Sequence, residues 1–208
     1  KTGIKHVIVT NVGDMHCPLK RTLINTVLKY VKKEVPAANI PGAIPLRKAL
    51  SKGKGKPYTS APATSEDIAV LQYTGGTTGV AKGAMLTHGN LMANMAQAYG
   101  VFKQVMNEGE ETVICPLPLY HIYAFTMHCM VLLQTGNHSI LIPNPRDIPG
   151  FIKTLQKTEF TGFVGLNTLF VALCAQDDFR ALDFSKLKLT VSGGMALTKA
   201  AFDEWKAV

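Results

Sequence analysis

Short runs of apolar residues alternate with stretches of helical periodicity along most of the chain. The strand candidates are His6–Thr10, Ile68–Tyr73, Thr112–Pro116, Ser139–Pro143, Phe160–Gly165 and Leu187–Ser192. Helical patterns occur near residues 88–105, 121–135, 147–157, 168–177 and 198–207. Strands that alternate with helices are typical of βαβ units. The pattern therefore predicts an α/β fold with a largely parallel sheet.

Residues 1–60 follow a different pattern, which predicts a basic amphipathic helix and then a loop. Apolar residues fall on one face of the helix, namely Leu23, Ile24, Val27, Leu28 and Val31. Residues 49–65 are rich in Gly, Pro, Ser, Thr and Lys, a composition that predicts a loop. The helix either packs its apolar face on its own domain or lies on an anionic membrane surface.

Charge is unevenly distributed between the two parts of the chain. Residues 1–60 hold 12 Lys and Arg against only Asp14 and Glu34, a net charge of +10, whereas residues 61–208 carry −2. A basic segment favours an anionic partner, unless acidic residues elsewhere in a longer protein balance it. Proteins that bind single-stranded nucleic acid place aromatic residues among the basic ones, and this segment has only Tyr30 and Tyr58. We therefore expect contact with an anionic membrane and none with nucleic acid.

The strongest chemical signal directly follows the strand candidate at 68–73. It reads Tyr73-Thr-Gly-Gly-Thr-Thr-Gly-Val-Ala-Lys-Gly83. The glycines let backbone amides approach an anion closely, while the hydroxyls and the lysine add further donors. The candidate phosphate-binding residues are Tyr73, Thr74, Gly75, Gly76, Thr77, Thr78, Gly79, Lys82 and Gly83.

Two well-known phosphate loops do not fit this segment. The Walker pattern needs Gly before its Lys and Ser or Thr after it, whereas here Ala81 precedes Lys82 and Gly83 follows. The dinucleotide-binding pattern needs a helix that begins at its last glycine. Here residues 81–86 are expected to be extended, and Thr87 is the expected N-cap of the next helix.

The segment resembles the signature of the adenylate-forming (AMP-binding) superfamily. Residues 71–90 resemble the bacterial long-chain fatty acyl-CoA synthetases in particular, which share Ala81 where most of the superfamily has Pro. Further matches to that group lie at 116–125, 144–149, 165–170 and 191–195. The resemblance covers essentially all 208 residues. It implies the large N-terminal domain of that family, in which layered β-sheets are flanked by helices.

The resemblance also implies how the chain is organised. We expect an internal fragment of that domain, with a basic segment at 1–60, a loop at 49–65, a nucleotide- and acyl-binding part at 68–208, and no C-terminal domain. A fragment of this kind is expected to be inactive by itself.

The implied reaction is the ATP-dependent activation of a long-chain fatty acid to an acyl-adenylate and then to acyl-CoA, with release of pyrophosphate and AMP. ATP and Mg²⁺ are the implied cofactors and CoA is the co-substrate. Thr74, Lys82 and His121 would be catalytic, and Thr74 would also hold the magnesium ion. Gly193 and Gly194 would line the adenine pocket, although a Ser-Gly-Gly after a strand is an ordinary turn. His128 is expected to be structural.

Two other functions remain open on the sequence. One is a fatty acyl-AMP ligase that passes the acyl group to a carrier protein, and the other is a non-catalytic basic module that docks on membranes. The resemblance also allows a homodimer.

The four cysteines are scattered and fit a reducing cytosol. The apolar run from Ile122 to Leu133 is too short to span a membrane, so any membrane contact would be peripheral, on the inner face.

Overall fold

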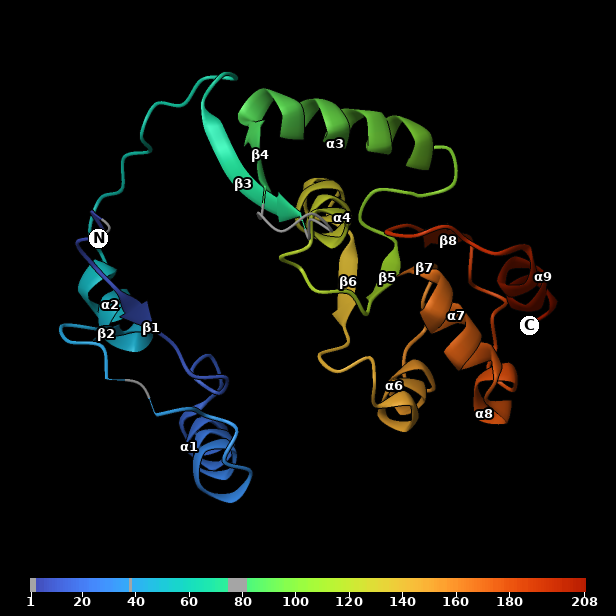
Figure 1. Ribbon diagram of the computed structural model, residues 1–208, viewed down its shortest axis with the longest axis horizontal. Helices are drawn as coiled ribbons and strands as arrows, with labels where there is room; N and C mark the ends of the chain where they lie inside the picture. Colours follow the sequence, from blue (N-terminus) through green and yellow to red (C-terminus); the bar gives the residue numbers. More distant parts are fainter. Residues whose placement is uncertain (1–2, 38, 75–81) are drawn as a thin grey trace. The chain divides into compact units, whose positions relative to one another are not determined.

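The computed structural model describes residues 3–37, 39–74 and 82–208, except for the side chain of Thr74. The chain forms two compact units, Lys1–Ala61 and Pro62–Val208 (Figure 1). Among the described residues, no helix combines the length and the apolar character that crossing a membrane requires.

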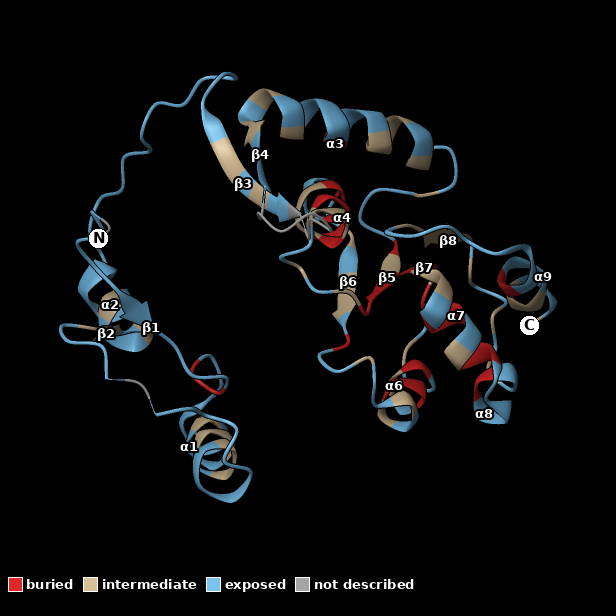
Figure 2. Ribbon diagram, viewed as in Figure 1, coloured by how far each residue is buried: buried red, intermediate tan, exposed pale blue. Residues whose placement is uncertain are grey.

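The first unit contains short elements. Strands β1 (Ile8–Val9) and β2 (Ile44–Pro45) form a parallel pair. Helix α1 (Pro18–Thr26) continues as the π-helical turn η1 (Val27–Val31), and α2 (Leu46–Gly53) follows β2. Figure 2 shows that most described residues of this unit are exposed. Asp14 is an exception, because it is buried and accepts hydrogen bonds from Asn11 and Asn25.

Two expectations for this unit need correction. Strand β1 is shorter than the predicted run at 6–10, and α2 occupies residues 49–53 of the predicted loop. On the predicted apolar face of the first helix, Leu23 and Val31 are 65% and 72% exposed. Within the unit the helix therefore packs with only part of its apolar stripe.

The second unit begins with an antiparallel hairpin. Strand β3 (Ile68–Thr74) pairs with β4 (Lys82–Thr87), so the expected extended conformation is confirmed for residues 82–86. Thr87 is the N-cap of α3 (His88–Phe102), as predicted. Its hydroxyl accepts a hydrogen bond from the backbone N–H of Asn90, whose side chain accepts one from the backbone N–H of Thr87. This capping box joins the hairpin rigidly to the helix.

A parallel sheet of four described strands forms the rest of the unit, in the order β6-β5-β7-β8 (Figure 1). The strands are β5 (Thr112–Cys115), β6 (His138–Leu141), β7 (Gly162–Gly165) and β8 (Leu189–Ser192). The helical segments are α4 (Ile122–Ala124), η2 (Phe125–Val131), α5 (Leu132–Gln134), α6 (Ile148–Leu155), α7 (Asn167–Cys174), α8 (Asp177–Arg180) and α9 (Lys199–Ala207). The prediction of an α/β fold with a largely parallel sheet is confirmed.

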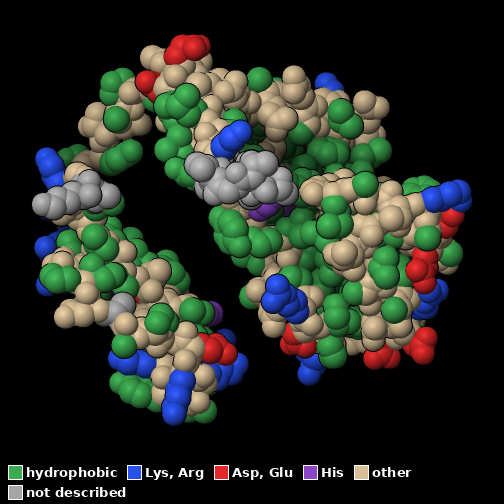
Figure 3. Space-filling view, in the orientation of Figure 1, with side chains coloured by type: hydrophobic (Ala, Val, Ile, Leu, Met, Phe, Trp, Pro, Cys, Tyr) green, Lys and Arg blue, Asp and Glu red, His purple; other side chains and the backbone are tan. Residues whose placement is uncertain are grey.

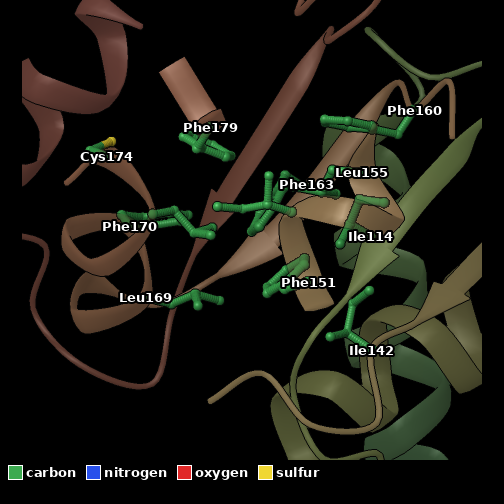
Figure 4. Close-up of a cluster of buried hydrophobic side chains, with 12 residues drawn as sticks. Ile114, Ile142, Phe151, Leu155, Phe160, Phe163, Leu169, Phe170, Cys174 and Phe179 are labelled. Atoms are coloured by element: carbon green, nitrogen blue, oxygen red, sulfur yellow. The ribbon is translucent and has the colours of Figure 1, made fainter. Parts of the chain in front are cut away.

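Successive side chains of the central strands enter two different cores. Ile114 and Phe163 face a cluster built with α6, α7 and α8, in which Phe151, Phe170 and Phe179 are buried (Figure 4). Val113 and Val164, the neighbours in sequence, face the opposite cluster with Met127 of η2. Side chains alternate along a strand, so these strands pack on helices with both faces of the sheet. A site can therefore form at the ends of the strands.

Candidate functional site

The segments that follow β5, β7 and β8 all leave the sheet at the carboxyl ends of its strands. After β5 the chain moves outward to β6, and it then returns to the other side of β5 to form β7. Ligands of open α/β sheets bind where successive connections diverge in this way. Residues 116–121 and 193–198 lie at this edge, and they include the predicted site residues His121, Gly193 and Gly194.

The end of the β3–β4 hairpin carries the other predicted residues. Tyr73 is paired with Gly83, and Thr74 with Lys82, whose side chain is exposed. A Cβ atom on Gly83 would lie 3.2 Å from Cζ of Tyr73, so the absence of a side chain there lets the tyrosine ring lie against the backbone. The predicted residues Gly75, Gly76, Thr77, Thr78 and Gly79 lie outside the described residues, as does the side chain of Thr74.

His121 caps the short helix α4 with its own ring. Its Nδ1 accepts a hydrogen bond of 3.3 Å from the backbone N–H of Tyr123. With Nδ1 acting as the acceptor, the proton of a neutral imidazole is on Nε2. The side chain is exposed, so this N–H group can donate to a bound molecule.

Tyr123 connects the segment that contains His121 to the segment that contains Gly193. This role of Tyr123 was not predicted from the sequence. Its hydroxyl donates a 2.9 Å hydrogen bond to the carbonyl oxygen of Val191 and a longer one, 3.5 Å, to that of Gly165. Its ring lies so close to Gly193 that a Cβ atom there would be 2.7 Å from Cζ. Burial raises the pKa of Tyr123, so the hydroxyl remains a donor at neutral pH. The available signal was a tyrosine within an otherwise apolar helix.

The glycine pair turns the chain away from the sheet. The N–H of Gly193 donates to the carbonyl of Gly165 (3.2 Å), and Gly194 has a φ of +77°, which favours glycine. Asn167, another residue not singled out in the sequence, binds the far end of the segment through Thr198. The backbone around Gly193 and Gly194 is therefore anchored on both sides.

An open apolar groove of about 380 Å³ lies beside this edge. It is lined by Leu117, Pro145, Arg146, Ile148, Leu166, Thr168, Leu169 and Ala172. These residues belong to segments that follow β5, β6 and β7 and to the first turns of α6 and α7. A groove lined mainly by apolar side chains, with Arg146 and Thr168 as its polar members, suits a long apolar ligand that carries an acidic group.

His128 lies apart from these residues, within the packed interior. Its Nδ1 is 3.0 Å from the hydroxyl of Ser139, and its Nε2 has no hydrogen-bond partner in the described part of the chain. Burial lowers the pKa of His128 to about 4, so the ring is neutral at pH 7.

The structure thus brings some of the predicted residues together and leaves others separate. Tyr123 joins the turn of His121 to Gly193. Among the described residues, no hydrogen bond or ion pair joins Lys82 to His121 or to the glycine pair. The sheet edge and the hairpin end therefore carry two separate groups of candidate residues.

Comparison with known proteins gives close relatives. A long-chain-fatty-acid–CoA ligase of Haemophilus influenzae is 49% identical over 206 residues, which are 98% of this chain and 37% of the relative. Its counterpart in Salmonella typhimurium is 47% identical over 205 residues, or 99% of this chain and 36% of the relative. The chain thus spans just over a third of the length of these curated relatives.

A solved structure shares the fold at low sequence identity. The complex of McyG A-PCP with phenylalanyl-adenylate has a TM-score of 0.69 and 19% identity, and the match covers 96% of this chain and 30% of that one. The family model described as AMP-binding enzyme matches residues 1–208. Together with the glycine- and threonine-rich segment between β3 and β4, this match shows that the chain belongs to the AMP-binding enzyme family.

Proposed function

We propose that the protein containing this chain activates long-chain fatty acids with ATP. The fatty acid carboxylate would attack the α-phosphate to give an acyl-adenylate and pyrophosphate, and the thiol of CoA would then displace AMP. The observation that carries the proposal is the identity of 47–49% with long-chain-fatty-acid–CoA ligases over nearly the whole chain.

The hairpin end is the proposed site for the triphosphate. Thr74 and Lys82, the residues on either side of 75–81, are paired, and the amides of a glycine-rich segment between them would converge on phosphate oxygens. The exposed Lys82 would supply the positive charge. It carries no ion pair in the described part of the chain that would have to break first.

Magnesium is part of this proposal, with Thr74 as a protein ligand. The described residues contain no group of three or more His, Cys, Asp or Glu side chains that could hold a metal ion. Mg²⁺ keeps several waters and is often bound by substrate phosphates with few protein ligands. The ion would neutralise charge on the phosphates.

The first step needs no general base, because a fatty acid carboxylate is already ionised at neutral pH. The contribution of the protein is therefore to place the reactants in line and to stabilise charge. The Nε2–H group of His121 would donate to an oxygen of the reacting groups, since its Nδ1 is held by Tyr123. Gly193 and Gly194 would let the adenine approach the backbone, and the apolar groove near Leu117 would take the acyl chain.

The test is AMP release from ATP by the whole protein, with a series of fatty acids and with or without CoA. The proposal expects catalytic AMP release with long chains only when CoA is present. If an acyl-adenylate accumulates and CoA does not turn it over, the protein is a fatty acyl-AMP ligase. If no fatty acid promotes the release of either pyrophosphate or AMP, fatty acid activation is excluded.

A second proposed activity is peripheral contact of residues 1–60 with the inner face of the cytoplasmic membrane. Leu19 and Leu23 of α1 are 86% and 65% exposed in this unit, which carries a net charge of +10. Figure 3 shows lysine and arginine side chains close to apolar ones on the displayed face of this unit. A surface of this kind suits anionic lipid.

Vesicle pelleting tests the contact. Binding to anionic vesicles that weakens with salt, and that a Leu19→Ser/Leu23→Ser variant loses, supports it. Equal pelleting with zwitterionic vesicles, or binding to nucleic acid instead, contradicts it.

A homodimer also belongs to the proposal, and light scattering of the whole protein measures it.

A further inference from the structure

Residues 193–198 connect β8 to α9 without burying large side chains. Met195 is 50% exposed and Leu197 is 38% exposed. Because burial of apolar side chains does not hold this segment, its conformation depends on the bonds at its two ends. The first end is fixed by the Gly193 N–H bond to Gly165 and by the ring of Tyr123.

Asn167 fixes the second end. It is the first residue of α7, and its side-chain oxygen accepts two hydrogen bonds from Thr198, one from the backbone N–H (2.9 Å) and one from the hydroxyl (3.0 Å). The backbone N–H can only donate, so the amide atom that faces it is the oxygen.

The hydroxyl of Thr198 extends this link into α9. It accepts a hydrogen bond of 3.3 Å from the N–H of Ala201, which caps the helix, while it donates to Asn167. Helix α9 is itself fixed, because Trp205 packs on Phe163 and Phe170 and donates to Thr190. Asn167 therefore ties the end of an exposed segment to two packed helices.

We propose that Asn167 is a positioning residue for the nucleotide. It holds residues 193–198 in one conformation, so that the backbone at Gly193 and Gly194 is in place before adenine arrives. This inference rests on the proposed function, in which those glycines line the adenine pocket. Because residues 193–198 are already ordered when the protein folds, ATP binding does not have to order them. This lowers the conformational entropy cost of ATP binding.

The experiment compares variants of the whole protein. Asn167→Ala removes the acceptor, and Thr198→Val removes the hydroxyl donor, while Thr198→Ser keeps it. Gln176→Ala is the matched control, because it removes an exposed side-chain amide just beyond α7 whose hydrogen bond goes to Ala172 and not to residues 193–198. We measure the ATP affinity by equilibrium dialysis, the KM for ATP and for fatty acid, and kcat.

Asn167→Ala is expected to raise the Kd and KM for ATP about 5- to 30-fold, the factor that corresponds to a change of one or two kcal/mol. The KM for fatty acid should stay unchanged. Thr198→Val should act in the same direction, whereas Thr198→Ser and Gln176→Ala should match the wild type. Equal increases in both KM values, or an unchanged ATP affinity in Asn167→Ala, overturn the proposal.

Amide hydrogen exchange without substrate provides a readout that does not depend on activity. Residues 195–198 should exchange faster in Asn167→Ala than in Gln176→Ala, and unchanged exchange overturns the positioning role. A wild-type protein that binds ATP but activates no fatty acid refutes the proposed function alone. In that case, the ATP affinity and the amide exchange of Asn167→Ala and Gln176→Ala still decide the role of Asn167.

Discussion

Gly193 lies where the ring of Tyr123 leaves no room for a side chain. A Cβ atom there would be 2.7 Å from Cζ and 2.9 Å from Cε1 of that ring, which is anchored by its hydroxyl to Val191. Gly194, one residue later, has open space around it but a φ of +77°. The two neighbouring glycines are therefore required for different physical reasons.

This difference can be tested with alanine at both positions. Gly193→Ala should lower the free energy of unfolding by roughly 1–3 kcal/mol through overpacking, and Gly194→Ala by about 1–2 kcal/mol through left-handed strain. In a Tyr123→Ala background the cost of Gly193→Ala should largely disappear, while that of Gly194→Ala should persist. Urea unfolding of these five variants and the parent measures these values. A Gly193→Ala cost that is the same in both backgrounds would contradict the steric explanation.

His128 should make stability depend on pH. Burial lowers its pKa to about 4, below the ordinary value of 6.5, so the unfolded chain takes up a proton as pH falls below 6.5 and the folded protein does not until about pH 4. The stabilisation is therefore complete above pH 6.5 and is lost as pH falls toward 4. Two and a half pKa units correspond to about 3 kcal/mol.

The measurement is the unfolding free energy at pH 7 and at pH 4.5. Between these values the wild type should lose about 2–3 kcal/mol more than His128→Asn, since other groups titrate alike in both proteins. His138→Asn is the control, because His138 is exposed at the start of β6. Identical pH dependence in wild type and His128→Asn would rule out this role for His128.

Helix α3 shows how one local pattern fixes an element. The capping box of Thr87 and Asn90 satisfies donors at the helix start and joins the helix to β4. Asn90→Ala should destabilise the protein by about 1 kcal/mol, as expected for the loss of a cap. Asn94→Ala, an exposed position in the same helix, should be neutral or slightly stabilising because Ala is the better helix former. Thermal unfolding compares them, and equal shifts in Tm would argue against the capping role.

The elements that the sequence predicted well are those with strong local signals. Strands β5, β7 and β8 lie within the predicted runs, because each contains apolar residues that enter the core between the sheet and its helices. Helix α2 was not predicted, since the composition of residues 49–65 suggested a loop from residue 49. The π-helical conformation of η1 and η2 was not predicted from the sequence.

At the scale of the whole molecule, the length of the relatives bears on activity. This chain spans 36–37% of the long-chain-fatty-acid–CoA ligases it matches. We therefore expect residues 1–208, expressed alone, to release no AMP in response to fatty acid and to bind ATP weakly at best. The whole protein under the same conditions is the control. Turnover of fatty acid by residues 1–208 would show this expectation to be wrong.

The sequence by itself determined the fold class, the alternation of strands and helices in the second unit and the family, because apolar periodicity and the run from Tyr73 to Gly83 are local properties of the chain. Only the tertiary structure brought Tyr123 to Val191 and Asn167 to Thr198, partners that lie 68 and 31 residues apart. Such pairs depend on the order in which the strands assemble and on which helices cover each face. A pattern of neighbouring residues specifies neither the order of the strands nor the helices that cover each face. The hydrogen bonds that position Gly193 and Gly194 are therefore visible only in the tertiary structure.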